Sequence, residues 1–460
     1  MKTKSFEPKI DIPSGALDIL RALNSAGFEA YIVGGCVRDS LLGIKPHDWD
    51  ITTSATPDQV KAVFESLEVY DTGIKHGTIT LRGTDRQMYE VTTFRIDGLY
   101  ADNRHPESVS FVTDVKDDLA RRDFTMNAIA YNPDTGLMDP FGGRQDIKDC
   151  IIRCVGDPNE RFKEDSLRIL RALRFSSVFN FEIAGSTSEA VINNRALLLN
   201  VSAERVYSEL TKLICGQNVY NVLSEYEPVI TFVIPELRPC VGFDQCSRWH
   251  QYDVYDHMAH AVASYPIGDP VIRFALLLHD IGKPQTFCLD EQGRGHFPDH
   301  NVAGAGLSRK ILTGLKADSL TRDTVARLVL LHDTRIEPER VPVKKFLSLH
   351  GVTETRQLLD VQMADTLAQA EPGKPERLRE IVNAQQLVDD IIDKGECFRL
   401  KDLAVNGDVL VNELDMKSGR EVGAMLDHLL TAVIEERIPN NREALMNEAR
   451  GFYNHTPDGL

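Results

Sequence analysis

Residues 29–52 read Glu-Ala-Tyr-Ile-Val-Gly-Gly-Cys-Val-Arg-Asp-Ser-Leu-Leu-Gly-Ile-Lys-Pro-His-Asp-Trp-Asp-Ile-Thr. The apolar run that ends at Gly34 and Gly35 predicts a short strand entering a tight turn. Residues 36–42 predict the helix that follows the turn, and residues 48–52 predict a second strand. This strand, turn, helix and strand order is typical of an α/β domain.

Two aspartates lie on the second predicted strand. Residues i and i+2 of a strand point to the same face, so Asp48 and Asp50 present two carboxylates side by side while Trp49 faces away. Mg²⁺ is bound by one or two carboxylates together with substrate phosphates. Two metals can activate an attacking hydroxyl and stabilise a leaving pyrophosphate. An isolated Asp-x-Asp pair is usually a solvated strand end, so this interpretation depends on its surroundings.

The glycine turn upstream is a candidate phosphate cradle. Glycine lets the backbone approach a phosphate closely, and a helix N-terminus offers free N–H groups with a favourable dipole. Arg38, in the first turn of the predicted helix, can then hold a phosphate through two N–H groups. The site predicted here comprises Gly35, Arg38 and the aspartate pair.

The rest of the chain predicts two regions of different character. Up to about residue 145, helices are expected at 14–27, from 56 onward and at 117–131, with strands at 77–82 and 88–95 and a loop at 97–110. Thr56, Pro57 and Gln59 form a predicted capping box. From Glu160 to the C-terminus, helical patterns dominate, with breaks at 228–239, 266–270, 286–299 and 371–375.

Length, charge and cysteine content restrict the possible classes of protein. A chain of 460 residues is expected to form several domains. A formal net charge of −17 argues against a nucleic-acid coat protein but allows an enzyme with a local basic track. The eight cysteines include no Cys-x-x-Cys, which favours reduced thiols and a cytoplasmic location. We find no apolar run of about 18 residues, so no membrane partner is expected.

Three motifs resemble those of class II tRNA nucleotidyltransferases and their bacterial poly(A) polymerase relatives. They are Gly34-Gly35-Cys-Val-Arg38-Asp39 with Asp48-Trp-Asp50, Arg121-Arg122-Asp123-Phe-Thr-Met-Asn127-Ala, and Glu164-Asp165-Ser-Leu-Arg168-Ile-Leu-Arg171-Ala-Leu-Arg174-Phe. The resemblance implies catalysis by Asp48 and Asp50 with Mg²⁺, and addition of CCA to the tRNA acceptor arm from CTP and ATP. It also implies nucleotide contacts at Gly35, Arg38, Arg122, Asp165, Arg168, Arg171 and Arg174.

The third motif also has a physical interpretation. Asp165 and Arg168 are three residues apart on a predicted helix and are therefore expected to be neighbours on its surface. Cytosine and adenine each present an amino donor beside a ring-nitrogen acceptor, which fits one aspartate and one arginine. Guanine and uracil present the reverse polarity and would leave buried groups unpaired. Glu90 is a weaker candidate for a third carboxylate near the metals.

A second group of candidate ligands lies in the helical half. Leu276-Leu-Leu-His-Asp-Ile-Gly282-Lys283 places adjacent His and Asp residues on an apolar helix. The pattern resembles the HD phosphohydrolase superfamily, which implies metal ligands at His257, His279, Asp280 and Asp365. His300 and His332 are candidates for a second metal position. Imidazole and carboxylate ligands suit a divalent transition metal that activates water.

The resulting expectation is an α+β chain. It has an α/β nucleotidyltransferase head at 1–145, a helical neck and body with the base-reading motif at 146–245, an HD domain at 246–370 and a helical tRNA-binding tail at 371–460. Residues Arg95 to Val109 resemble a loop that is shortened in the family enzymes that add only CC, and the full length here implies that addition of CC alone is disfavoured. Addition of CCA and addition of A alone both remain open. The rival functions are a poly(A) polymerase, a protein that is mainly an HD hydrolase, and a non-catalytic RNA-binding protein.

Overall fold

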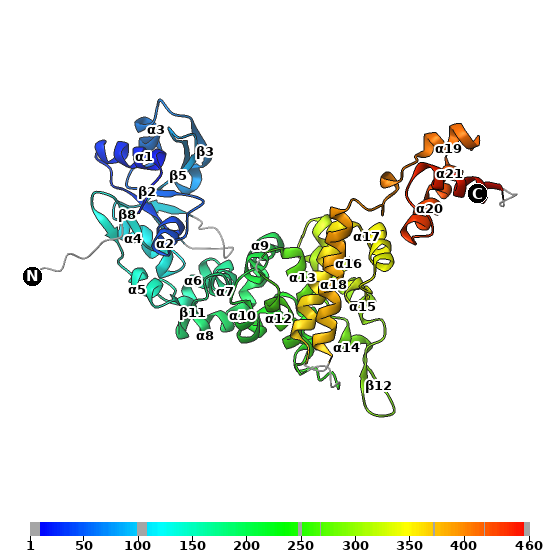
Figure 1. The fold of residues 1–460 in the computed structure, drawn as a ribbon. Helices are drawn as coiled ribbons and strands as arrows, with labels where there is room; N and C mark the ends of the chain where they lie inside the picture. The colour runs from blue at the N-terminus through cyan, green and yellow to red at the C-terminus, as the bar shows by residue number, and fades with distance from the viewer. Residues whose placement is uncertain are drawn as a thin grey trace, which may run out of the picture. The chain divides into compact units, whose positions relative to one another are not determined.

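The computed structural model describes residues 10–98, 108–246, 251–266, 268–370, 373–417 and 419–454. The chain divides into two compact units, Met1–Pro235 and Glu236–Leu460. Strands and helices mix in the N-terminal part, and helices dominate the remainder (Figure 1). This is the mixed α+β organisation that the sequence predicts.

A mixed β-sheet forms the core of the first unit. Within the described residues it has seven strands in the order β3-β4-β5-β2-β1-β8-β9. Its strands are β1 Ala30–Val33, β2 Asp50–Thr53, β3 Val69–Gly73, β4 Thr78–Arg82, β5 Met88–Thr93, β8 Ala130–Asn132 and β9 Gly136–Met138. Strand β2 runs parallel to β5, with Asp50 opposite Glu90, and antiparallel to β1. This register places the two acidic residues at the same end of neighbouring strands.

Three short strand pairs lie outside this sheet. They are β6 Arg95–Asp97 with β7 Val109–Phe111, β10 Ile151–Ile152 with β11 Glu182–Ile183, and β12 Cys288–Leu289 with β13 Gly295–His296. The first pair flanks the segment predicted as a loop, of which residues 99–107 lie outside the described residues.

Helices surround the sheet and continue the first unit. They are α1 Ser14–Ser25, α2 Gly35–Leu41, α3 Pro57–Val63, α4 Val115–Ala120, α5 Gly143–Lys148, α6 Pro158–Glu164, α7 Leu167–Phe179, α8 Gly185–Asn193, α9 Ala203–Ile214, α10 Val219–Glu225 and α11 Glu227–Val233, with 3₁₀ turns η1 Ile74–His76, η2 Thr125–Asn127 and η3 Arg195–Asn200. The capping box of α3 is confirmed, since the Thr56 backbone N–H donates to Gln59 Oε1 at 2.8 Å.

The predicted helix at 117–131 is wrong beyond its first turn. Helix α4 ends at Ala120, and the chain continues through η2 into β8. The carboxylate of Asp123 accepts hydrogen bonds from the Phe124 backbone N–H at 2.8 Å and from Asn127 Nδ2 at 3.0 Å. Short polar side chains that bond to nearby backbone in this way compete with helix formation.

The single helix expected to carry both Asp165 and Arg168 is also wrong. Helix α6 ends at Glu164, Asp165 is extended with φ −133° and ψ 103°, and Arg168 lies in α7. Asp165 Oδ1 accepts the backbone N–H of Leu167 at 3.1 Å, so this residue caps the new helix instead of continuing the old one.

Over its described residues, the second unit is helical apart from the β12–β13 pair. Its helices are α12 Val254–Ser264, α13 Pro270–Leu278, α14 Lys283–Thr286, α15 His300–Gly314, α16 Ser319–Leu331, α17 Arg340–Ala368, α18 Lys374–Asp393, α19 Gly407–Leu414, α20 Arg420–Ile434 and α21 Arg442–Asn454, with 3₁₀ turns η4 Pro235–Cys240, at the boundary between the units, and η5 Leu400–Asp402. Helix α12 packs on α13 and α17, and α15 packs on α16. Across the described stretches of the chain, no helix combines the length and the apolar character that membrane crossing requires.

Candidate functional site

A cavity of about 410 Å³ in the first unit gathers most of the residues singled out by the sequence. Its walls come from the glycine turn before α2, from β2, from the segment between α4 and η2, and from α7 and α9. The cavity is lined by Gly34, Gly35, Arg38, Asp50, Arg121, Arg122, Asp123, Asn127, Asp165, Leu167, Arg168, Arg171, Arg174, Phe175 and Arg205. All seven predicted nucleotide contacts are among them, whereas Asp48 is not.

The glycine turn has the backbone that the cradle interpretation requires. Gly34 has φ +82°, a conformation that side-chain-bearing residues rarely adopt. A Cβ at this position would lie 3.0 Å from Arg122 Nη1. The turn therefore allows the arginine to approach the backbone at the N-terminus of α2.

Arg38 is held in place from three sides. Its Nη1 donates to Asn127 Oδ1 at 2.7 Å, and its Nε donates to Asp39 Oδ1 at 2.8 Å. The guanidinium lies over the rings of Phe175 and Phe179, with centroid distances of 5.0 and 4.9 Å. Its position is thus fixed before any anion is bound.

Asp123 connects the second motif to the arginines of α7. Its Oδ2 accepts from Arg171 Nε at 2.8 Å, while its Oδ1 accepts from Asn127. Burial acts to raise the pKa of Asp123, but Arg171 and Asn127 outweigh burial and hold that pKa well below its ordinary value. The same ion pair raises the pKa of Arg171 against the effect of burial. Asn127 therefore joins Arg38 and Arg171 into one rigid network.

The residues predicted to read the base, Asp165 and Arg168, have different partners from those the sequence predicts. Asp165 accepts Arg205 Nη2 at 3.1 Å, and Arg168 Nη1 donates to Glu164 Oε2 at 2.7 Å. Arg168 Nη2 also donates to the backbone carbonyl of Arg121 at 2.9 Å. An aspartate acceptor and an arginine donor still face the same cavity, but each is positioned by a third residue.

Arg174 is a largely enclosed arginine of α7, with its side chain 12% exposed. Its Nη1 donates to Glu209 Oε1 at 3.0 Å, and its guanidinium lies 4.1 Å from the centroid of the Phe175 ring. Burial lowers the pKa of Arg174 to about 10, with Glu209 opposing that effect. This side chain supplies a desolvated positive charge at the wall of the cavity.

Three carboxylates lie on or beside the neighbouring strands β2 and β5: Asp48, Asp50 and Glu90. Asp48 and Asp50 are exposed while Trp49 is buried, as the alternation predicts, although strand β2 begins only at Asp50. Although Asp50 is partly open to solvent, the protein around its carboxylate displaces water and raises its pKa. Arg122 opposes this effect, while the charges of Glu90 and Asp48 raise the pKa further. A divalent cation would relieve such crowding of like charges. The all-oxygen ligand set suits Mg²⁺.

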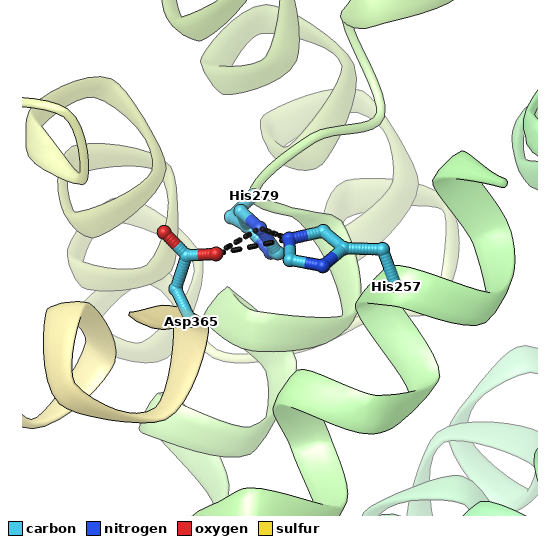
Figure 2. A group of neighbouring side chains, drawn as sticks. All are labelled: His257, His279 and Asp365. Atoms are coloured by element: carbon cyan, nitrogen blue, oxygen red, sulfur yellow. Dashed lines mark hydrogen bonds and ion pairs between the residues drawn. The ribbon is translucent and has the colours of Figure 1, made fainter. Parts of the chain in front are cut away.

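A second cluster occupies the helical unit. His257 of α12, His279 after α13 and Asp365 of α17 converge from three directions (Figure 2). His257 Nε2 lies 2.9 Å from Asp365 Oδ1, and His279 Nε2 lies 3.2 Å from His257 Nε2. Two ring nitrogens this close repel unless a proton or a cation lies between them.

Asp280, His300 and His332 form an adjoining group. The Nε2 atoms of His300 and His332 are 3.3 Å apart. Asp280 directs Oδ1 toward His300 at 3.5 Å and Oδ2 toward His279 at 3.3 Å, so it lies between the two groups. In the described part of the chain, these are the two groups of three candidate ligands whose atoms lie within 4.8 Å of one another. The carboxylates of Asp48, Asp50 and Glu90 are therefore more widely spaced.

The protonation pattern of this cluster fits metal ligation. The Nδ1 atoms of His279, His300 and His332 lie 2.8, 2.9 and 2.7 Å from the backbone carbonyls of Leu276, Phe297 and Val329. A carbonyl can only accept, so each Nδ1 is the donor and each Nε2 lone pair faces inward. Burial lowers the pKa of His279, but Asp280 and Asp365 outweigh burial and raise it. The cluster therefore attracts positive charge.

Some residues of both sites were not predicted. Arg205 contacts Asp165, which lies 40 positions earlier, and no local pattern links the two. Glu209 was missed for the same reason. Lys283, whose Nζ lies 2.7 Å from Asp280 Oδ2, follows Asp280 by three residues, and this spacing could have been recognised.

Comparison with known proteins places the chain in a family. The family model "Poly A polymerase head domain" matches residues 30–153, "Probable RNA and SrmB- binding site of polymerase A" matches 180–227 and "tRNA nucleotidyltransferase domain 2 putative" matches 308–449. The CCA-adding enzyme of Geobacillus thermodenitrificans is 35% identical over 440 residues, covering 94% of this chain and 95% of the relative. That of Staphylococcus aureus strain MRSA252 is 33% identical over 431 residues, covering 94% and 96%.

Solved structures give the same result. The CCA-adding enzyme of Bacillus stearothermophilus, in complex with CTP, matches with a TM-score of 0.71 and 30% identity, covering 96% of this chain and 98% of that chain. The enzyme of Thermotoga maritima, complexed with tRNA, shares the fold at 19% identity with a TM-score of 0.57, covering 95% and 94%. With relatives this similar over nearly their whole length, the chain belongs to the class II family of CCA-adding enzymes and poly(A) polymerases.

Proposed function

We propose that this chain adds C, C and A to the 3′ end of tRNA from CTP and ATP without a nucleic-acid template. The observation that carries the proposal is the single cavity that brings the glycine turn, Asp50 and the motif arginines together. The names of its full-length relatives, and the CTP complex of one of them, support the substrate assignment.

The residues of the cavity fit the parts of this reaction. The tRNA 3′-oxygen forms a bond to the α-phosphorus, the bond between that phosphorus and the bridging oxygen breaks, and pyrophosphate leaves. Asp48 and Asp50 would hold Mg²⁺, which lowers the barrier by stabilising the attacking and leaving oxygens. Gly35, Arg38 and Arg122 are placed to bind phosphate oxygens, and the fixed position of Arg38 reduces the ordering cost of binding.

Base selection would rest on Asp165 and Arg168, with Arg171 and Arg174 completing the nucleotide site. The aspartate accepts the amino group of cytosine or adenine, and the arginine donates to the adjoining ring nitrogen. Because Arg205 already holds Asp165, the carboxylate would not have to be ordered when the base arrives. The tRNA acceptor arm would follow a basic track that includes Arg121.

The test is incubation with Mg²⁺ and tRNA lacking its last three nucleotides, with CTP alone, ATP alone and both. We expect two C with CTP, then one A, and a stop. Asp48→Ala should abolish incorporation, while Asp58→Ala, an exposed carboxylate on α3, should not. Extension only of tRNA that ends in CC would identify an A-adding enzyme. A long A ladder would identify a poly(A) polymerase, and absent incorporation would refute the polymerase proposal.

A second activity is favoured by the facing Nε2 atoms of the histidine cluster. We propose that the segment around residues 246–370 is an HD domain whose ligands are His257, His279, Asp280 and Asp365, with His300 and His332 holding a second ion. A divalent transition metal there would activate water. The reaction would remove phosphate from damaged RNA 3′ ends. The neck and body at 146–245 and the tRNA-binding tail at 371–460 complete the proposed domains.

Metal content and phosphate release test this second proposal. The purified chain loaded with Mn²⁺ should hold two tightly bound ions, and His279→Ala should lose them together with phosphate release from 3′-phosphorylated tRNA. Asp50→Ala should retain both, and so should His296→Ala, which changes an exposed histidine of the same unit. A chain that keeps its metal but releases no phosphate would carry an inert scaffold in this region.

A further inference from the structure

A cavity of about 370 Å³ adjoins the histidine cluster within the second unit. Its wall includes His332 and Asp365, one residue from each of the two candidate ligand groups. A molecule in this cavity would therefore reach both groups at once. Among the described residues that line the cavity, Arg335 and Arg377 supply guanidinium groups.

Arg377 is held in a defined position relative to the ligands. Its Nη2 donates to Gln362 Oε1 at 3.2 Å, and the buried Gln362 in turn donates to the backbone carbonyls of His332 at 3.0 Å and Thr334 at 2.7 Å. The amide of Gln362 thus links the guanidinium to the backbone of a ligand residue. The Arg377 side chain is 25% exposed, so its guanidinium can still contact a molecule in the cavity.

Glu380 holds the two guanidiniums together. Its Oε2 accepts Arg377 Nη1 at 3.2 Å, and its Oε1 pairs with Arg335. Two guanidiniums that share one carboxylate retain one positive charge between them and several N–H donors, while Asp333 and Glu376 also line the cavity. This arrangement can accept a second anion, and the oxygens of phosphate, like those of a carboxylate, match the arginine fork.

We propose that this cavity recognises substrates by two phosphates, the one to be released at the metal ligands and a second one at Arg377 and Arg335. This inference rests on the proposed hydrolase function and names its substrate class: a 3′-phosphomonoester whose nucleoside also carries a 5′-phosphate. Two kinds of molecule carry this pair of phosphates. One is a free nucleoside 3′,5′-bisphosphate, and the other is a 3′-phosphorylated RNA end, in which the last phosphodiester is the second phosphate.

The reaction is a balanced hydrolysis. A water oxygen forms a bond to the 3′-phosphorus, the bond from phosphorus to O3′ breaks, and O3′ takes a proton. Adenosine 3′,5′-bisphosphate gives adenosine 5′-monophosphate and inorganic phosphate. Adenosine 3′-monophosphate, which lacks the second phosphate, gives adenosine and inorganic phosphate and is the reference substrate.

The kinetic test compares these two substrates in the Mn²⁺-loaded full chain. We expect kcat/KM to favour the bisphosphate about tenfold, mainly through KM, because one charge-assisted contact changes affinity by roughly that factor. Arg377→Met and Arg335→Met should bring the ratio of the two kcat/KM values toward one, while the chain retains both bound ions. Glu380→Gln should widen the preference by releasing the arginines, which a purely structural role would not produce.

Arg356→Met is the matched control, because Arg356 also joins α17 to α18 through an ion pair with Asp389 but lies outside the cavity lining. It should leave the preference unchanged. A 3′-phosphorylated dinucleotide used better than the bisphosphate would identify an RNA end as the source. A bisphosphate used better than the dinucleotide would identify a free nucleotide as the substrate.

Equilibrium binding of adenosine 3′,5′-bisphosphate separates this inference from the hydrolase proposal. If no substrate is hydrolysed, the hydrolase proposal fails, but weaker binding by Arg377→Met than by the unaltered chain still supports the subsite. Equal KM values for the two substrates together with unchanged binding by Arg377→Met would overturn the subsite, whether or not phosphate is released.

Discussion

At the scale of single residues, the sequence identifies the side chains of the first cavity better than their partners. The resemblance of the motifs to a known family predicted seven nucleotide contacts, and all seven residues line this cavity. Their contacts depend on tertiary packing, since Asp165 pairs with Arg205 and Arg171 pairs with Asp123, 48 positions away. Separations of this size leave no local pattern, so a single sequence could not have given the pairs.

The Asp123–Arg171 pair leads to a prediction about stability and pH. Asp123→Asn keeps the shape but leaves the guanidinium without its counter-charge, which should cost about 3 kcal/mol of unfolding free energy near neutral pH. The folded pKa of Asp123 lies below its unfolded value. Its contribution is therefore full above about pH 4 and is lost as pH falls through the folded pKa. Urea denaturation at several pH values should show that the difference in unfolding free energy between the unaltered chain and Asp123→Asn becomes smaller in acid.

Asp117→Asn serves as the control for this comparison. Asp117 is an exposed carboxylate in the first turn of α4, close in sequence to Asp123. Its substitution should change stability by less than about 0.5 kcal/mol at every pH. A gap for Asp123→Asn that stays constant from neutral to acid pH would mean that packing, and not charge, accounts for the loss.

At the scale of elements, periodicity predicted the strands and helices that carry the aspartate pair, but not where side chains interrupt a helix. The run at 117–131 has helical character, yet the hydrogen bonds of Asp123 end the helix early. The turn at Asp165 is similar, because its carboxylate caps α7. Strand β3 was missed, and it lies at the edge of the sheet, where it pairs with one neighbour.

Gly282 gives a prediction about how two elements of the second unit pack. A Cβ at Gly282 would lie 2.1 Å from the backbone carbonyl oxygen of His300, at the start of α15, and rotamer changes cannot relieve a backbone clash. Gly282→Ala should therefore push α15 away from the His279–Asp280 turn. We expect a loss of about 1–3 kcal/mol in stability and weaker metal binding. Calorimetry and metal analysis of the Mn²⁺-loaded chain would measure both.

The matched control lies on α15, the helix that Gly282 contacts. Gly306 is exposed in α15, and a Cβ there would meet no atom within 4 Å. Gly306→Ala should stabilise the chain by up to about 1 kcal/mol through helix propensity and leave metal binding intact. Equal metal binding by the Gly282→Ala and Gly306→Ala chains would show that the ligand cluster does not depend on this helix contact.

At the scale of the whole molecule, each compact unit contains one of the two candidate sites. The residues of the first cavity lie between positions 34 and 205, and the histidine cluster uses positions 257–365. The change from mixed to helical character was visible in the sequence. The boundary between Pro235 and Glu236 falls within the predicted break at 228–239, but its exact position depends on where contacts become sparse.

This separation predicts that metal removal acts on one unit at a time. A ligand at 100 times its Kd stabilises a unit by about 2.7 kcal/mol, which corresponds to roughly 5–10 °C for a unit of this size. EDTA should therefore lower one calorimetric transition of the Mn²⁺-loaded chain by that amount, and His279→Ala should remove the EDTA effect. CTP with Mg²⁺ should raise the other transition, in His279→Ala as in the unaltered chain. If EDTA moved both transitions together in the absence of nucleotide, the two units would unfold cooperatively, and the metal cluster would stabilise the polymerase unit as well as its own.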